Sequence, residues 1–274
     1  MPIAGFSPLA VLPGLSYAEA MLNIVIHGEP TDAPPLLIVP GLFGSARNWG
    51  VIARRLSDDR QVIAVDMRNH GDSPWYPGHS YADLAGDLAE VIEAHGGRAA
   101  VLGHSMGGKA AMQLALTEGD LVAQLIVADI APVAYRHSQN PMIDAMEALD
   151  LTGLKLRSEA DKRMAETIDE PGVRAFLLQS LDLTQTPPRW KLNLPVLRAH
   201  MDQITGWPET PGQYIGPCDM IYGALSNYVR PEAHAGILAQ FPAARFTAIE
   251  GAGHWLHADR PREFEAALRI ALSS

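Results

Sequence analysis

The sequence places a serine between two glycines at a spacing that can present a nucleophile. The run from Gly103 to Gly107 matches the pattern Gly-x-Ser-x-Gly, follows a short apolar run and precedes a segment of helical period. A sharp turn from strand to helix leaves no space for side chains beside the serine, and glycine fits there. The first amides of the helix then face negative charge that develops during a reaction. We therefore predict that Ser105 is the nucleophile of a hydrolytic reaction.

The same stretch partly matches a phosphate-binding loop. Residues Gly103 to Lys109 fit the first seven positions of Gly-x-x-x-x-Gly-Lys-Ser/Thr, but Ala110 supplies no hydroxyl for a magnesium ion. A loop of that kind should also lie near the start of a nucleotide-binding domain. The nucleophile is therefore the favoured interpretation.

A serine hydroxyl needs an imidazole within hydrogen-bond reach to act as a base. Among ten histidines, His254 follows the last apolar run, inside Gly251 to Trp255, where small residues let a loop bend back over a sheet. We predict His254 as the base, with His257 as the alternative. His70 and His104 are compatible with structural roles, and His104 is also a candidate for substrate contact because it precedes Ser105.

The carboxylate that orients the base is expected at an unusual position. The common arrangement has Gly-x-x-Asp after the penultimate strand, but here the fourth residue from Gly223 is Ser226. Asp129 ends the strand after the nucleophile helix and points to the same edge of the sheet. We predict Asp129 as the acid and Ser226 as its hydrogen-bonding helper. Asp219 would enter its strand at the wrong end.

A glycine-flanked turn at Pro40 to Ser45 can aim backbone amides at a substrate oxygen. We predict that the amides of Leu42 and Met106 form the oxyanion hole, with Phe43 as the alternative to Leu42. The Phe43 ring is also a candidate for the acyl pocket.

These residues require a mostly parallel sheet with crossover helices, because short apolar runs alternate with longer segments of helical period. The predicted strands are Leu22–His27, Leu36–Val39, Val62–Asp66, Ala99–Gly103, Leu125–Asp129, Met220–Gly223 and Arg245–Ile249. The predicted helices are Ala46–Leu56, Tyr81–Ala94, Met106–Thr117, Pro231–Gln240 and Arg262–Leu272.

The stretch from Pro132 to Pro217 interrupts this alternation. It has helical pattern but no convincing strand, and it is too long for a loop. We expect an α/β core of residues 1–131 and 218–274, with residues 132–217 forming a helical cap over a pocket. Lys109 is expected to lie at the surface or to contact this cap.

Three apolar side chains of the cap are candidates for setting acyl length together with Phe43. They are Met142, Met146 and Leu177, and each is equally compatible with the core of the cap.

Composition excludes several classes of function. A formal net charge of −10 gives no basic surface for nucleic acid. Cys218 is the only cysteine, so no intrachain disulfide is possible. The first basic residue is Arg47, so we expect the start of the sequence to carry neither a signal peptide nor a mitochondrial transit peptide. No apolar run approaches the roughly twenty residues of a membrane span. We expect a soluble, cytoplasmic protein without membrane insertion, and nothing in the sequence indicates its oligomeric state.

Taken together, five motifs resemble the YbfF-type bacterial esterases and related ABHD-type hydrolases of the α/β-hydrolase superfamily. They are Pro-Gly-Leu-Phe-Gly-Ser at 40–45, Asp-Met-Arg-Asn-His-Gly at 66–71, Gly-His-Ser-Met-Gly-Gly-Lys at 103–109, Asp-Ile-Ala-Pro-Val at 129–133 and Gly-Ala-Gly-His-Trp at 251–255. The resemblance implies a helical cap after the sixth strand, no cofactor or metal, and short- to medium-chain acyl esters or acyl-CoA thioesters as substrates. Pro40 departs from the superfamily, where a histidine often supports the oxyanion loop.

Ester hydrolysis is the main functional prediction, with acyl-CoA thioesterase as the alternative. Relatives that attack with an aspartate at the turn between strand and helix are not favoured, because this chain has Ser105 at that position. Haloperoxidase-like enzymes without cofactor and carbon–carbon bond hydrolases share the triad and stay open. A non-catalytic binding protein is less favoured because all three triad residues are present.

Overall fold

The computed structural model describes residues 21–273 and is built around one large sheet. The strand order is β1-β3-β2-β4-β5-β8-β9, in which β1 pairs antiparallel with β3 and all other neighbours are parallel. The carboxyl ends of parallel strands meet at one edge, so residues that follow β4, β5 and β9 come together there. The bounds are β1 (Ile24–His27), β2 (Leu36–Val39), β3 (Val62–Val65), β4 (Ala99–His104), β5 (Val122–Ala128), β8 (Cys218–Gly223) and β9 (Ala244–Ile249).

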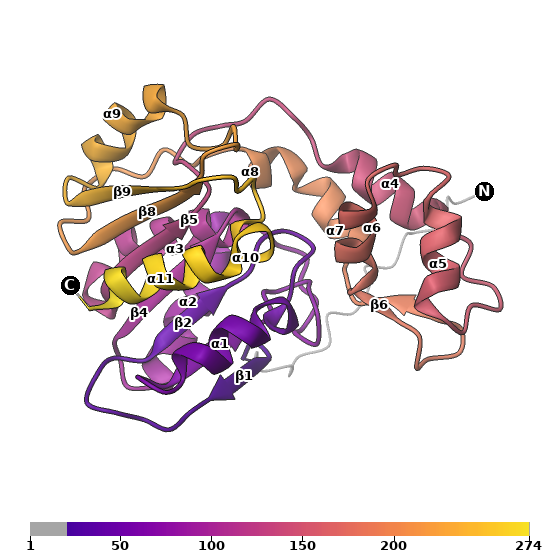
Figure 1. The fold of residues 1–274 in the computed structure, drawn as a ribbon, viewed down its shortest axis with the longest axis horizontal. Helices are drawn as coiled ribbons and strands as arrows, with labels where there is room; N and C mark the ends of the chain where they lie inside the picture. The colour runs from indigo at the N-terminus through magenta and orange to yellow at the C-terminus, as the bar shows by residue number, and fades with distance from the viewer. Residues whose placement is uncertain (1–20, 274) are drawn as a thin grey trace, which may run out of the picture.

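Helices cover both faces of the sheet because successive strand residues point to opposite sides (Figure 1). In β2, Leu37 and Val39 pack in one apolar cluster with α2 and α3, whereas Leu36 and Ile38 pack in a second cluster with α1 and α11. All four side chains are buried, as expected of a parallel strand covered on both sides. The helices are α1 (Gly50–Leu56), α2 (Tyr81–Ala94), α3 (Met106–Thr117), α9 (Pro231–Gln240), α10 (Leu256–Asp259) and α11 (Pro261–Leu272), with 3-10 turns at Ala46–Trp49 and Gly119–Leu121.

The predicted elements agree closely with the structure where the sequence carries a start signal. The helix predicted for Tyr81–Ala94 has these bounds, because the Ser80 hydroxyl accepts the Asp83 amide at 3.1 Å and the Asp83 carboxylate accepts the Ser80 amide at 2.9 Å. The helices predicted for Met106–Thr117 and Pro231–Gln240 also have the observed bounds.

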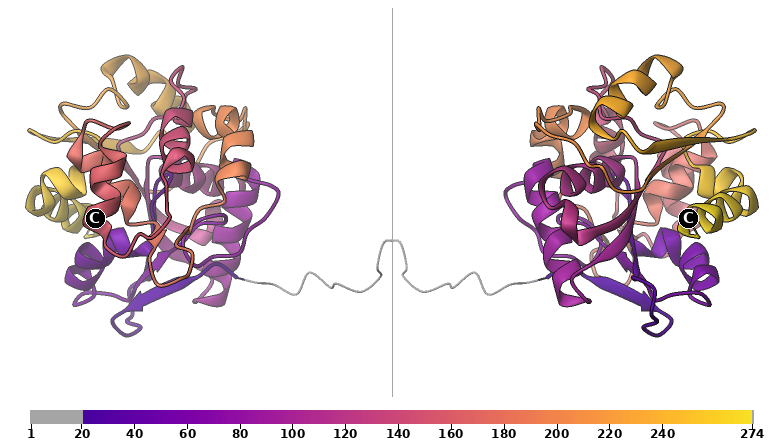
Figure 2. Two further views of the ribbon diagram at one scale, coloured as in Figure 1. Left: turned by 90° about the vertical axis from the view of Figure 1, so that its right-hand side faces the viewer. Right: turned by 90° about the vertical axis from the view of Figure 1, so that its left-hand side faces the viewer.

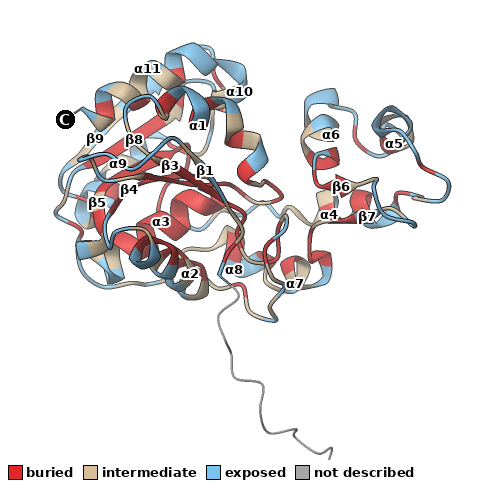
Figure 3. Cartoon of the chain, turned by 90° about the horizontal axis from the view of Figure 1, so that it is seen from below, coloured by how far each residue is buried: buried red, intermediate tan, exposed pale blue. Residues whose placement is uncertain are grey.

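The stretch between β5 and β8 forms a largely helical body beyond the end of the sheet. In Figure 3 most of its helices lie together on one side, and the left view of Figure 2 shows them in front of the sheet. The prediction that this stretch has no strand was wrong, because Leu181–Asp182 pairs with Arg189–Trp190. The insertion was expected after the sixth strand, but it follows β5. Among the described residues, five strands precede it. Its elements are α4 (Asn140–Ala148), α5 (Arg157–Met164), α6 (Pro171–Leu178), β6 (Leu181–Asp182), β7 (Arg189–Trp190), α7 (Leu194–Ala199) and α8 (Met201–Thr205).

The loop after β3 ties this inserted segment to the core. Asn193 donates to Asn69 twice, from its backbone amide to the carbonyl and from its side-chain amide to Oδ1, at 3.0 Å each. Lys191 Nζ pairs with Asp72 at 2.7 Å. The buried Asp66 holds the loop by accepting the Asp72 amide at 2.9 Å.

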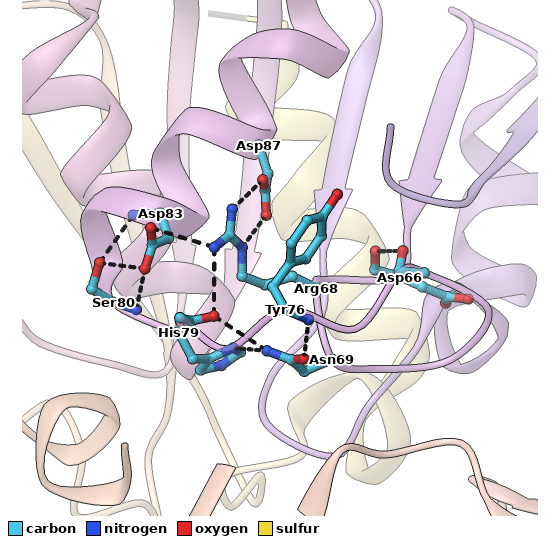
Figure 4. A network of polar contacts seen from close by, with 10 residues as sticks. Asp66, Arg68, Asn69, Tyr76, His79, Ser80, Asp83 and Asp87 are labelled. Atoms are coloured by element: carbon cyan, nitrogen blue, oxygen red, sulfur yellow. Dashed lines mark hydrogen bonds and ion pairs between the residues drawn. The ribbon is translucent and has the colours of Figure 1, made fainter. Parts of the chain in front are cut away.

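Figure 4 shows that the same loop is anchored to α2 by a polar network. Arg68 donates to both carboxylate oxygens of Asp87 at 2.6 Å each, and Asn69 Nδ2 lies 3.3 Å from His79 Nδ1. The other ring nitrogen of His79 lies 3.4 Å from Met106 Sδ. This network therefore reaches the first residue of α3.

Within residues 21–273, no helix combines the length and the apolarity needed to span a membrane. The expectation that the chain start lacks a targeting signal concerns residues 1–20, which lie outside the described range.

Two buried histidines in this loop make stability depend on pH. Burial lowers the pKa of His70 from 6.5 to about 4 and the pKa of His79 to about 2. As pH falls from 6.5 to 4, the unfolded chain therefore binds protons that the folded chain does not, and the free energy of unfolding falls. His70→Gln should reduce the loss between pH 7 and pH 5 by about 2 kcal/mol. Urea unfolding at these two pH values measures it, and equal losses in both proteins would contradict the assignment.

Candidate active site

Ser105 occupies a strained turn between β4 and α3. Its φ of 53° and ψ of −120° are unfavourable for a residue with a side chain, and its amide is held by the carbonyl of Ala128 at 3.1 Å. A Cβ on Gly103 would lie 2.3 Å from the carbonyl oxygen of Gly107, and one on Gly107 would lie 2.3 Å from the carbonyl oxygen of Val39. The turn therefore closes only with glycine at both flanks, as the motif predicts.

The structure brings the three predicted triad side chains into a line at the carboxyl edge of the sheet. His254 Nε2 lies 3.1 Å from Ser105 Oγ, and His254 Nδ1 lies 2.7 Å from Asp129 Oδ2. A carboxylate only accepts, so Nδ1 carries the proton and Nε2 is left to accept from the serine hydroxyl. The Asp129 side chain is fully buried, whereas the His254 side chain is 22% exposed. This arrangement can activate the serine for attack.

The Asp129 carboxylate is fixed by groups from the neighbouring strand end. The Gly223 amide donates to Oδ1 at 3.0 Å, and the Ser226 hydroxyl donates to Oδ2 at 2.5 Å. Asp129 itself has a φ of 52°, in the left-handed region that is unfavourable for a residue with a side chain. Ser226 thus contacts the predicted acid, Asp129, from the position where the common arrangement has the acid itself.

The predicted oxyanion loop passes directly beside Ser105. A Cβ on Gly41 would lie 3.1 Å from Ser105 Cβ, and both Leu42 and Met106 line the same cavity as Ser105. Met106 is the first residue of α3, so its amide has no acceptor within the helix. The two amides predicted to form the oxyanion hole, those of Leu42 and Met106, therefore belong to two backbone segments that both lie beside Ser105.

The loop keeps its shape without the histidine that Pro40 replaces. The Gly44 amide donates to the Gly41 carbonyl at 3.0 Å. The Phe43 carbonyl, in a residue with a φ of 65°, accepts from the Ser180 hydroxyl of the inserted segment at 2.8 Å. The loop is therefore supported by a hydrogen bond within its own turn and by one from the inserted segment.

A mostly aromatic and aliphatic cavity of about 110 Å³ opens beside Ser105. Phe43 and His104 line it, as predicted. Met142, Met146 and Leu177 do not line it, because they pack in the main apolar cluster and so belong to the core of the cap. Sequence reasoning missed several lining residues, which are Tyr81, Lys109, Tyr135, His137, Phe176, Ile204, Tyr228 and Trp255.

The model of the alpha/beta hydrolase family matches residues 36–267, which is most of the chain. The chain belongs to the α/β-hydrolase family. Esterase YbfF from Escherichia coli (strain K12) is 40% identical over 243 residues, covering 87% of this chain and 93% of that protein. The sn-1-specific diacylglycerol lipase ABHD11 from Mus musculus is 38% identical over 258 residues, covering 91% of this chain and 84% of that protein. A solved marine microorganism esterase has a TM-score of 0.86 at 35% identity, covering 91% of this chain and 98% of that chain.

The other histidines near the site of this hydrolase have contacts that account for them. His104 Nε2 donates to the His254 carbonyl at 2.9 Å and so steadies the loop that carries the predicted base. Burial holds the pKa of His104 well below its usual range. His257, the alternative base, stacks on Trp49 with ring centroids 4.3 Å apart, and the structure pairs Ser105 with His254 instead.

The close approach of Gly107 to the backbone of Val39 in this hydrolase can be tested directly. Gly107→Ala should lower the free energy of unfolding by about 1–3 kcal/mol or more, because the new methyl group meets backbone carbonyls that cannot move aside. The matched control is Gly86→Ala in α2, where a Cβ meets nothing within 4 Å. This control should raise stability by about 0.5–1 kcal/mol. Chemical unfolding of both variants measures the difference, and a neutral Gly107→Ala would refute the packing argument.

Proposed function

We propose that this α/β-hydrolase is a serine esterase that cleaves carboxylic esters of short- to medium-chain acids through an acyl-enzyme on Ser105. The single observation that carries the proposal is the contact chain of 3.1 Å from Ser105 to His254 and 2.7 Å from His254 to Asp129, beside an apolar cavity. The relatives named esterase and lipase support the same class of reaction.

The geometry suits two successive acyl transfers. In the first, His254 Nε2 takes the proton of Ser105 as Oγ attacks the ester carbon, and then gives that proton to the oxygen of the leaving alcohol. In the second, His254 takes a proton from water as the water oxygen attacks the acyl-enzyme, and then returns that proton to Ser105 Oγ as the bond to the acyl carbon breaks and the acid leaves. Asp129 keeps the imidazole in the required tautomer and stabilises its charged form in both steps.

The oxyanion of each tetrahedral intermediate is proposed to accept from the amides of Leu42 and Met106. Backbone amides are preorganised, so they stabilise the new charge without reorganising during the reaction. The positive end of α3 adds to this stabilisation because Met106 opens the helix.

The cavity supports an apolar acyl group of modest size. Its lining is dominated by rings and aliphatic side chains such as Phe43, Phe176 and Trp255. Its volume of about 110 Å³ is of the order of engineered cavities that hold a benzene-sized ligand.

We also propose that residues 1–131 and 218–274 form the catalytic core and residues 132–217 the cap. The run of elements α4 to α8 between β5 and β8 supports this division. A cytoplasmic location is proposed as well, supported by the buried Cys218 thiol, which stays reduced there.

Replacing the nucleophile is the central test. Ser105→Ala should lower ester turnover by about 10⁶-fold, the loss seen when such a serine is removed, while thermal unfolding stays cooperative. The assay is a panel of acyl esters of graded chain length beside matched acyl-CoA thioesters. Ser57→Ala, at the end of α1, is the control and should keep full activity. Ester turnover that survives in purified Ser105→Ala protein would end the proposal, and activity on thioesters alone would make the chain a thioesterase.

The acid can be tested separately from the nucleophile. Asp129→Asn should lower turnover by about 10⁴-fold, because an amide cannot hold the correct imidazole tautomer or stabilise its charge. Ser226→Ala should lower turnover far less, because it removes one hydrogen bond to a charged group and so raises the activation free energy by only about 1.5–3 kcal/mol. Steady-state kinetics on one good ester compare the two. A larger loss for Ser226→Ala than for Asp129→Asn would show that the acid is misassigned.

A further inference from the structure

Lys109 is a buried lysine that takes no part in the contacts among Ser105, His254 and Asp129. It lies one helical turn after Ser105 on α3, and only 1% of its surface is exposed. The expectation of a surface position was therefore wrong, whereas the expected contact with the inserted segment exists. The ion pairs formed among residues 21–273 do not include Lys109, so its partners must be found among neutral groups.

Those partners are consecutive carbonyls at the end of α8. Lys109 Nζ donates to Thr205 O at 3.0 Å and also to Gly206 O. Tyr81 of α2 donates its hydroxyl to Ile204 O at 2.6 Å. The last carbonyls of a helix lack donor partners within it. Here two core side chains supply donors, and the Tyr135 amide also donates to Thr205 O at 2.9 Å.

Aromatic rings enclose the ammonium group. Lys109 Nζ lies 4.7 Å from the centroid of the Tyr135 ring and 5.9 Å from that of Tyr81. Burial lowers the pKa of Lys109 to about 7. A neutral amine retains two N–H donors, which match the two carbonyls, so the contact persists in either protonation state.

This contact forms one wall of the cavity beside the nucleophile. Tyr81, Lys109, Tyr135, Ile204 and Thr205 all line the same cavity as Ser105. In Figure 1, α8 lies at the junction between the sheet and the remaining helices of the insertion. The position of α8 relative to α3 therefore sets how far this wall stands from the serine.

We propose that Lys109, assisted by Tyr81, is a positioning residue that limits acyl-chain length by holding the Ile204–Gly206 end of the insertion against the nucleophile helix. This inference rests on the proposed esterase function. Without the lysine, the half-buried Gly206 carbonyl loses its lysine donor and the Thr205 carbonyl keeps only the Tyr135 amide, at 2.9 Å. The cost of these lost hydrogen bonds moves this end of α8 toward water. The cavity then lengthens at that wall and admits longer chains.

The test is the ratio of kcat/KM for an octanoate ester to kcat/KM for the acetate ester of the same alcohol. Lys109→Met keeps the length of the side chain but removes its donors. It should raise this ratio by about tenfold, the selectivity carried by roughly two buried methylene groups, through a lower KM for the longer ester. Tyr81→Phe removes only the hydroxyl and should raise the ratio by about threefold.

The matched control is Lys191→Met. Lys191 also ties the insertion to the core, through Asp72 at 2.7 Å, but its side chain is 31% exposed and does not line this cavity. This variant should keep the wild-type ratio. A loss of insertion contacts in general would instead change the ratio in both lysine variants and would overturn the proposal.

The outcomes separate this inference from the function on which it rests. An active wild type with an unchanged ratio in Lys109→Met, or with equal losses on all chain lengths, overturns the positioning role alone. A wild type that cleaves no ester overturns the proposed function, and this inference falls with it. If Lys109→Met fails to unfold cooperatively, Tyr81→Phe decides, and an unchanged ratio there is again a refutation.

Discussion

The site depends on a carboxylate that is buried completely at the edge of the sheet. Asp129 has no exposed surface, and a buried charge without partners is strongly destabilising. Its two oxygens accept from the Gly223 amide, the Ser226 hydroxyl and His254 Nδ1. These donors come from the last residue of β8, from the turn that follows it and from the loop after β9, so the order β5-β8-β9 is a requirement of the charge as much as of the apolar core. The imidazole is oriented because it is one of the few groups able to complete this shell.

The sequence was informative wherever a local physical constraint admits few residue types. The turn around Ser105 needs glycine at two positions, so Gly103 and Gly107 located the turn and the start of α3. The Ser80 capping box fixed the start of α2. Asp129 was predicted as the acid by elimination, because Ser226 cannot carry a negative charge and Asp129 follows the adjacent strand. The catalytic roles of these residues stay predictions, although their side chains lie in contact.

The cavity was less predictable because its walls come from the tertiary placement of the insertion. Leu177 and Phe176 are neighbours on one helix, yet only Phe176 lines the cavity while Leu177 packs in the apolar cluster. Helical period alone does not decide which face of α6 meets the nucleophile. A lysine usually lies at the surface. The carbonyls that accept from Lys109 lie 96 and 97 residues later in the chain. The hydrophobic periodicity of the sequence does not indicate hydrogen-bond acceptors that lie so far along the chain.

The insertion and the core exchange hydrogen bonds in both directions beside Ser105. Ser180 of the insertion donates to the Phe43 carbonyl in the predicted oxyanion loop, while Lys109 of the core donates to the carbonyls of Thr205 and Gly206. In each case the acceptor is main chain, which every residue type supplies. Substitutions of the side chains at 204 and 205 can therefore reshape the cavity without releasing the wall that bears them. Substitution of Lys109 moves the wall itself, so position and shape of this pocket are controlled by different residues.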